Sequence, residues 1–276
     1  MESNKANDFG YIDGVAQEER VTELSDEQGM AIASVKGFMD GNGFGHYVIG
    51  GVAGSGKSTV IPYIVDECGT PYSAGTGQGS VAVCAYTGKA VMNLKRKGIP
   101  NAMTLHSFLY DTRVSTDSMT GEKIVVHSRK DDCCFRGIRL LIVDEASMVG
   151  REMFDVIESL PFKTVYIGDH FQLPPVNDKF NIMEKPDFRM ERIHRQELDN
   201  PIVALADMAR NGKPIPLGVF GSSKHTRSLD RSDLPAYSEI VTWTNATKDA
   251  VNECIRESRG FQKDVPQVDD KLTPNP

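Results

Sequence analysis

Residues 46–61, His-Tyr-Val-Ile-Gly-Gly-Val-Ala-Gly-Ser-Gly-Lys-Ser-Thr-Val-Ile, constrain the fold more than any other stretch. A β-favouring run precedes the glycines and an apolar run that can begin a helix follows them, and the match to G-x-x-x-x-G-K-[ST] lies between the two. Such a loop turns backbone N–H groups toward phosphate oxygens, its lysine reaches the β- and γ-phosphates, and its serine can ligate Mg²⁺. The stretch therefore predicts a nucleoside triphosphate site, whose expected contacts are Gly51, Ala53, Gly54, Ser55, Gly56, Lys57, Ser58 and Thr59.

Composition excludes several classes of protein. The 276 residues allow one large domain or two modest ones, and 39% hydrophobic with 25% charged residues is typical of soluble globular chains. Five scattered cysteines without C-x-x-C argue against a disulfide framework or a zinc site and fit a reducing compartment. No long apolar run or signal pattern is found, so we expect a cytoplasmic protein (in the host cytoplasm if a phage encodes it) without a membrane partner.

The net charge of −7 does not exclude nucleic acid as a partner. Residues 1–27 hold eight acids and two bases, so that this acidic stretch accounts for most of the charge and the rest is close to neutral. Residues 85–100 carry four basic side chains and no acid. Local charge matters more than the sum for a groove that follows phosphates.

A second predicted strand, residues 81–87, runs into a predicted helix at 88–97. Thr87, Gly88 and Lys89 would then lie at the carboxyl edge of the sheet, where open α/β sheets bind ligands. An ordinary strand-to-helix turn explains this stretch alone slightly better. His106 and Ser107 follow, and a lone histidine is more often structural than functional.

Residues 139–144 read as a buried strand that ends in Asp144 and Glu145. Asp144 would take part in an Mg²⁺ shell, and Glu145 would orient and deprotonate an attacking water. Alone, the pattern could be a strand ending at a solvated loop. Its position about 90 residues after the phosphate-binding loop favours the catalytic interpretation.

Three further side chains each have two interpretations. Gln172 follows a strand at 164–168, and its amide suits sensing a γ-phosphate, although Asp169 and Gln172 could equally serve a turn. Gln28 completes a capping box with Ser25 at the start of a helix, and a glutamine upstream of such a loop can also read adenine. Arg195 belongs to a regular row of arginines that is either a solvated face or a source of a phosphate ligand.

Two further features of the sequence concern the domain organisation. Residues 113–127 read as a β-hairpin around Gly121 that interrupts the α/β pattern, so we expect an insertion. Residues 239–245 read as a strand that runs into a helix at 246–258.

In order and spacing, these motifs resemble superfamily 1 helicases of the 5′-to-3′ branch, the RecD/Dda-like group, over about residues 24–260. The most specific element is Gly-Asp-x-x-Gln-Leu-Pro-Pro, which carries more information than the phosphate-binding loop by itself. One departure is Tyr86, which stands where the family usually has proline. The motifs that carry the resemblance lie at residues 51–59, 87–90, 104–107, 143–147, 168–176, 193–196 and 244–245.

The resemblance implies an α/β fold: a RecA-like P-loop NTPase domain with a mainly parallel sheet flanked by helices, an inserted β-hairpin and part of a second RecA-like domain. It implies ATP and Mg²⁺ as cofactors and single-stranded and fork DNA as partners. It makes Gln28 the adenine reader and assigns Gln172 and Arg195 to the γ-phosphate. The DNA contacts that it implies are Thr87, Gly88, Lys89, His106, Ser107 and Asn245, with Met119 at the tip of the hairpin pin.

The expected domains follow from the resemblance. They are an acidic tail at 1–23, a first motor domain at 24–177 with the pin at 111–135, the first part of a second motor domain at 178–260, and the start of an inserted module or an unstructured end at 261–276. No family motif follows Asn245, so we expect a shortened second motor domain and weak or absent activity for this chain alone. The missing motor segment, or replication and recombination proteins, are the expected partners.

The leading hypothesis is an ATP-dependent helicase motor that moves on single-stranded DNA and separates duplex with the pin. The alternatives are a translocase that does not unwind, a non-catalytic DNA-binding fragment, and a P-loop phosphotransferase acting on a small acceptor. The Gly-Asp-x-x-Gln-Leu-Pro-Pro element has no role in the last of these.

Overall fold

The computed structural model describes residues 23–116, 123–175, 178–192, 201–237, 240–262 and 265. The chain divides into two compact units, Met1–Asn200 and Pro201–Pro276. None of the helices in these ranges is long and apolar enough to cross a membrane.

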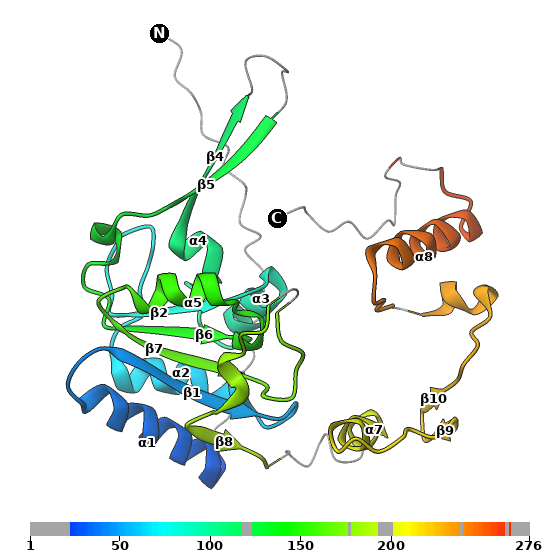
Figure 1. Ribbon diagram of the computed structural model, residues 1–276, viewed down its shortest axis with the longest axis horizontal. Helices are drawn as coiled ribbons and strands as arrows, with labels where there is room; N and C mark the ends of the chain where they lie inside the picture. The colour runs from blue at the N-terminus through cyan, green and yellow to red at the C-terminus, as the bar shows by residue number, and fades with distance from the viewer. Residues whose placement is uncertain are drawn as a thin grey trace. The chain divides into compact units, whose positions relative to one another are not determined.

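A six-stranded sheet forms the centre of the first unit (Figure 1), and every neighbouring pair in it is parallel. The strands β2, β6 and β7 are buried along their whole length, as expected for parallel strands that are covered on both faces. Because all strands run the same way, their carboxyl ends meet at one edge. The order across the sheet is β3 (Met103–Thr104), β2 (Val81–Ala85), β6 (Leu140–Asp144), β7 (Lys163–Gly168), β1 (Gly45–Gly51) and β8 (Phe188–Met190).

Helices cover both faces of this sheet. One apolar cluster joins the sheet to α1 (Asp26–Asp40), α2 (Lys57–Cys68) and α3 (Gly88–Arg96), and the other joins it to α4 (Leu105–Leu109) and α5 (Arg151–Glu158). Successive strand residues enter opposite clusters, as Val48 and Ile49 do, because side chains alternate along a strand. The expected mainly parallel α/β domain is confirmed.

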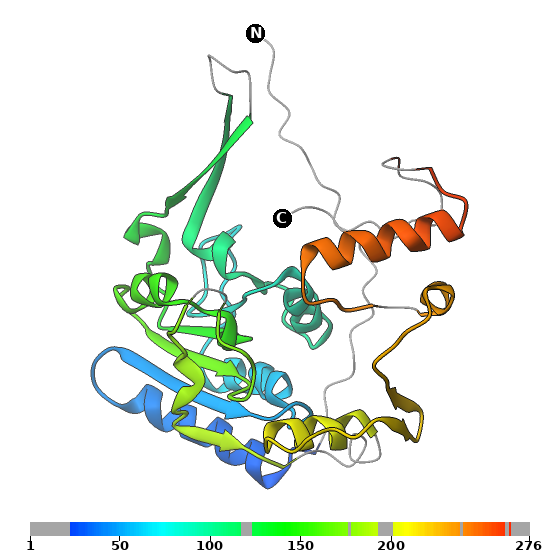
Figure 2. The ribbon, with the colours of Figure 1, turned by 45° about the vertical axis from the view of Figure 1, so that its right-hand side comes forward.

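The inserted hairpin is also present. Strands β4 (Tyr110–Thr116) and β5 (Lys123–Arg129) pair antiparallel from Tyr110 opposite Arg129 to Thr116 opposite Lys123. Figures 1 and 2 both show the two strands extending away from the central sheet. Met119, the expected wedge at its tip, lies outside the described residues.

The first unit extends further along the chain than the expected boundary at 177. Strand β8 pairs with β1 through Ile49 opposite Phe188, and Met190 at its end is fully buried. This pairing places β8 in the first unit, although the sequence suggested the second motor domain from residue 178 onward.

The second unit contains α7 (Pro201–Arg210), a two-stranded antiparallel ribbon of β9 (Gly218–Phe220) and β10 (Ser223–His225), and α8 (Asn245–Ser258). The expected helix at 246–258 is confirmed by α8, but the expected strand at 239–245 is wrong for the part that the structure describes. Residues 240–244 pair with no strand there, and Val241 and Trp243 are 89% and 87% exposed. Without a neighbouring strand the backbone has no ladder to join, whatever its intrinsic preference.

Candidate functional site

The loop between β1 and α2 has the backbone shape that its glycines allow. Gly54 and Gly56 both have φ of +80°, in the left-handed region that favours glycine. A Cβ placed on Gly51 would lie 2.6 Å from Ser55 Oγ, so the loop closes tightly around that serine. Among the residues that the structure describes, the buried Ser55 hydroxyl has no hydrogen-bond partner, and Gly56 provides no side-chain cap for the first N–H groups of α2. Unsatisfied donors at a helix N-terminus are suited to an anion such as phosphate.

Lys57 lies against this loop. Its ammonium donates hydrogen bonds of 2.8 Å to the carbonyl oxygens of Gly51 and Val52. Its positive charge also acts on Asp144 at the end of β6. The lysine of the loop and the acid at the strand end therefore belong to one site at one edge of one sheet.

Asp144 is buried and hydrogen-bonded to the side chain of Ser58, the first hydroxyl of α2. Burial, and then the charge of Glu145, raise the pKa of Asp144 to about 6, while its bonds to Ser58 and to the Glu145 N–H act in the other direction. A divalent cation would supply the positive charge that this carboxylate needs. No group of three or more His, Cys, Asp or Glu side chains in the described ranges could hold a metal alone, so phosphate and water oxygens would complete an Mg²⁺ shell.

Glu145 has an unusual backbone. Its φ of 55° and ψ of 41° place it in the left-handed region, where it is the non-glycine residue with positive φ in the described chain. Such a conformation costs on the order of 1–3 kcal/mol and persists where the surrounding structure enforces it. It turns the chain sharply from β6 into the short 3-10 helix η2 (Ala146–Met148). We call the segment from the two acids to the end of η2, residues 144–148, the acid turn.

Gln172 is hydrogen-bonded to the acid turn. The Ser147 hydroxyl donates a 2.6 Å hydrogen bond to Gln172 Oε1, which joins the segments that follow β6 and β7. Asp169 is buried, and its carboxylate accepts the N–H of Phe171, so the turn interpretation of Asp169 is correct. Sequence reasoning did not single out Ser147, although its place two residues after the acid pair was a usable signal.

A groove of about 480 Å³ lies beside the acid turn. It brings together two motifs that are distant in sequence, since His106 lies on one wall and Leu173 on another. The His106 ring is exposed and contacts the rings of Tyr86 and Tyr110 at 5.9 and 6.0 Å between centroids. Aromatic and apolar walls of this kind suit a flat ring such as a nucleobase.

Some of the residues predicted to contact DNA, which adjoin Tyr86 and His106 in sequence, also form hydrogen bonds within the protein. Thr87 caps α3 by accepting the N–H of Ala90 at 3.2 Å. The Ser107 hydroxyl bonds to Thr104 at 2.8 Å, and Lys130 donates to the Ser107 carbonyl at 2.6 Å. Gly88 and Lys89 are exposed at the start of α3.

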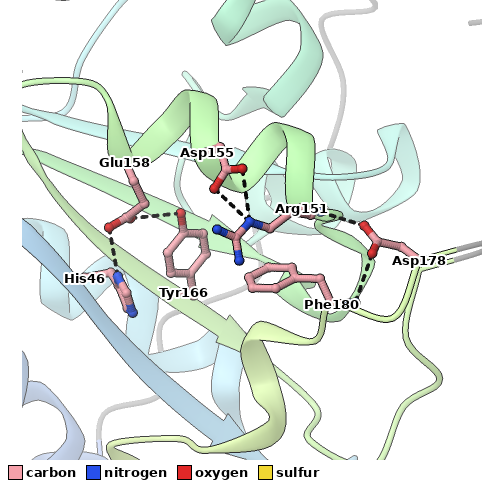
Figure 3. Close-up of polar contacts among 7 residues, drawn as sticks. All are labelled: His46, Arg151, Asp155, Glu158, Tyr166, Asp178 and Phe180. Carbon is pink, nitrogen blue, oxygen red and sulfur yellow. Dashed lines mark hydrogen bonds and ion pairs between the residues drawn. The ribbon is translucent and has the colours of Figure 1, made fainter.

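Helix α5 contributes to the groove and is anchored at both ends (Figure 3). At its start, Asp178 accepts the backbone N–H groups of Arg151 at 2.7 Å and Phe180 at 2.9 Å. At its end, Glu158 lies 2.9 Å from His46 Nδ1 and accepts the Tyr166 hydroxyl at 3.4 Å. These bonds connect α5 to β1 and β7, and the bond to Glu158 raises the pKa of His46.

Comparison with known proteins shows what the chain is similar to. A family model described as an AAA domain matches residues 44–178. The ATP-dependent DNA helicase Dda of enterobacteria phage T4 is 29% identical over 178 residues, which cover 61% of this chain and 38% of that helicase. The chain is therefore similar to ATP-dependent DNA helicases of the Dda and Pif1 group.

Two further proteins are similar to the chain. The ATP-dependent DNA helicase RRM3 of Saccharomyces cerevisiae is 27% identical over 220 residues, or 69% of this chain and 28% of RRM3. The solved Pif1 helicase from Candida albicans has the same fold, with a TM-score of 0.54 and 22% identity over 88% of this chain and 56% of that one. The chain spans less than two thirds of the length of each of these relatives.

The structure describes two further predicted site residues, Gln28 and Asn245, and does not describe a third. Gln28 is buried at the start of α1, where its Oε1 accepts the Ser25 N–H and its own N–H donates to Ser25 Oγ, so the capping box is confirmed. Arg195 lies outside the described residues. Asn245 is the first residue of α8 in the second unit, following the Thr244 cap.

Proposed function

We propose that this chain is the motor part of an ATP-dependent DNA helicase. It uses Mg²⁺ and ATP to move along single-stranded DNA in the 5′-to-3′ direction, and it separates fork DNA with the β4–β5 hairpin. The single observation that supports this most is the convergence of the phosphate-binding loop and the strand-end acids, with Ser58 bonded to Asp144. The relatives Dda and RRM3, both named ATP-dependent DNA helicases, point the same way.

In this proposal the loop from Gly51 to Thr59 binds the triphosphate through its backbone N–H groups, and Lys57 exchanges its loop carbonyls for phosphate oxygens. Ser58 and Asp144 hold Mg²⁺, which when bound neutralises charge on the phosphates. Gln28 reads adenine with its amide in addition to capping α1.

Glu145 acts as the general base. It takes a proton from a water whose oxygen bonds to the γ-phosphorus, while the bond from that phosphorus to the β–γ bridging oxygen breaks and ADP leaves. Gln172 and Arg195 contact the γ-phosphate. The Ser147 bond holds Gln172 beside the acid turn, which supports its place in this group.

The DNA side of the proposal uses the groove. A nucleobase stacks against the Tyr86 and His106 rings, while Thr87, Gly88, Lys89 and Ser107 face the backbone. Asn245 adds a contact from the second unit, and Met119 is the wedge of the pin. Replication or recombination proteins in the cytoplasm are the proposed further partners.

ATP turnover with and without single-stranded DNA tests the proposal. We expect a DNA-stimulated rate, although a slow one for this chain alone, because arginines from both motor domains are worth roughly 10³–10⁵ in rate. A rate that single-stranded DNA leaves unchanged contradicts the proposal and favours a phosphotransferase or a non-catalytic module.

A translocase that does not unwind is the second candidate, because Met119 stands where an aromatic wedge would be stronger. A forked-duplex assay of wild type and Met119→Gly separates the two. If the pin separates strands, the variant loses unwinding and keeps its DNA-stimulated ATPase. Equal strand separation by both proteins, or none by either, favours the translocase.

A further inference from the structure

Lys97, which caps the end of α3, reaches the first turn of α2. Its ammonium donates a hydrogen bond of 3.4 Å to Thr59 Oγ1, a residue 38 positions earlier in the chain. Both residues are half-buried. Thr59 directly follows Ser58, whose hydroxyl bonds to Asp144. The contact therefore lies at the end of α2 that adjoins the phosphate-binding loop.

This is an unfavourable place for a cation in the protein without nucleotide. The N-terminus of a helix is the positive end of its dipole and disfavours positive side chains. The first turn of α2 already contains Lys57, holds no acid and has no side-chain cap. In the part of the chain that the structure describes, Lys97 forms no ion pair, and the Thr59 hydroxyl is the group that its ammonium contacts. An anion at this helix end would supply the missing negative charge.

The end of α3 offers a simpler reason for a lysine at this position. Cations suit the C-terminus of a helix, and the last turn of α3 contains two more of them, Lys95 and Arg96. Arg96 is exposed, however, whereas the Lys97 ammonium is directed to the start of α2. The dipole of α3 therefore explains the charge of Lys97 and leaves the direction of its side chain unexplained.

The bond from Lys97 leaves the Thr59 hydroxyl free to donate. A hydroxyl has one proton and two lone pairs, and here one lone pair accepts from the ammonium. Its proton is then available for a second hydrogen bond, which a charged neighbour in the same chain of bonds strengthens. Phosphate oxygens are strong acceptors for such a donor.

We propose that Lys97 is a positioning residue for the phosphates of the bound nucleotide. It orients the Thr59 hydroxyl so that its proton is directed to a phosphate oxygen, and its charge offsets part of the phosphate charge. This inference rests on the part of the proposed function in which the loop binds ATP, and it does not depend on DNA. Because the contact is already made in the ground state, its loss should raise KM for ATP and change kcat by less than about twofold.

The test measures binding of a fluorescent, non-hydrolysable ATP analogue with Mg²⁺ to the full chain. Lys97→Met removes the ammonium at Thr59, and Arg96→Met, the matched control, removes a positive charge from the same end of α3. We expect Lys97→Met to weaken binding roughly tenfold, because hydrogen bonds to charged groups contribute about that factor or more. Arg96→Met should bind within about twofold of wild type.

A double-mutant cycle tests whether Lys97 acts through Thr59. Thr59→Val removes the hydroxyl and keeps the branched shape of the side chain. If the two residues act as one unit, the variant that carries both Lys97→Met and Thr59→Val should bind within about twofold of the weaker single variant.

Thermal unfolding without nucleotide distinguishes this role from that of a lysine that only holds α3 to α2. Removing a cation from the positive end of α2 relieves repulsion, which offsets the lost bond to Thr59. Lys97→Met should therefore melt no lower than Arg96→Met. A lower melting temperature for Lys97→Met, with unchanged nucleotide binding, would show a structural role and overturn the proposal.

Failure of this inference can be told from failure of the proposed function. If the wild type binds the analogue but single-stranded DNA does not stimulate hydrolysis, the helicase proposal fails and the binding data still decide the role of Lys97. If the wild type does not bind the analogue, both fail. If Lys97→Met binds like wild type, if Arg96→Met weakens binding equally, or if the two single losses add in full in the double variant, only the role of Lys97 is overturned.

Discussion

Asp144 is a buried carboxylate, proposed to bind a cation, whose burial lowers the stability of the folded protein. It is buried beside the charge of Glu145. The groups that favour its ionised form are the Ser58 hydroxyl, one backbone N–H and the nearby Lys57. The charged form is disfavoured until a cation arrives, which is a common property of binding sites. The same residue should therefore limit the stability of the protein without nucleotide.

Asp144→Asn should stabilise the protein at neutral and alkaline pH. Because the folded pKa of about 6 exceeds the ordinary value of 3.8, the folded state binds the proton more tightly, and stability rises as pH falls through 6. Asparagine mimics the neutral form, so we expect a gain on the order of 2 kcal/mol at pH 8 that disappears near pH 4. Urea unfolding at the two pH values measures this.

A matched control is Asp178→Asn. Asp178 is half-buried, and its bonds to the Arg151 and Phe180 N–H groups lower its pKa. Its stabilising contribution is present above its unfolded pKa and lost as pH falls through the lower folded pKa. The variant should therefore be less stable than wild type at pH 8; a gain in both variants would contradict the role of burial at Asp144.

At the scale of elements, the helices around the site are held at their ends by charged side chains from other segments. Lys163 is buried at the start of β7 and donates to the carbonyls of Phe38 at 2.6 Å, Met39 at 2.9 Å and Gly41 at 2.6 Å. These carbonyls are at the end of α1, where a cation suits the helix dipole.

Lys163→Met should destabilise the protein by about 3 kcal/mol, because it leaves buried carbonyl groups without their donor. Thermal or urea unfolding measures the loss. Lys36→Met is the control, since Lys36 pairs with Glu67 on an exposed surface of the same helix and should have little effect. Equal losses in the two variants would show that the end of α1 does not depend on Lys163.

Helix α5 should be sensitive to pH through His46. The hydrogen bond to Glu158 raises the pKa of His46 above 6.5, so the stabilisation is fully present below the unfolded pKa and is lost as pH rises through the folded value. His46→Gln should therefore lose more stability at pH 6 than at pH 9 in unfolding measurements. A loss of the same size at both pH values would mean that the charged pair contributes nothing.

The elements also show what sequence patterns can and cannot predict. The phosphate-binding loop, the acid pair after β6 and the capping box at Ser25 were predictable because each depends on neighbours in sequence. The bonds of Glu27 to the chain after β8, and of Glu158 to His46, depend on sheet order and have no local pattern. Residues 240–244 show the opposite case, since a β-favouring run forms no strand without a partner.

At the scale of the whole molecule, the residues of the proposed nucleotide site lie at one edge of one parallel sheet. The sheet order places β7 alone between β6 and β1, so the acids that follow β6 come close to the loop that follows β1. The groove with His106 lies beside the segment that follows these acids, because Met148 at the end of η2 lines it. In the proposed function, this arrangement would allow DNA in the groove to influence the residues proposed to hydrolyse ATP.

Glu145→Gln tests this central claim most directly. The substitution keeps the size of the side chain and removes the proposed base, so DNA-stimulated ATP hydrolysis should fall at least about a hundredfold. Binding of a fluorescent ATP analogue should remain within about threefold of wild type, and Glu152→Gln, which changes another acid lining the groove, should keep its hydrolysis. An unchanged hydrolysis rate in Glu145→Gln would contradict the claim that the strand-end acids and the phosphate-binding loop form one catalytic site.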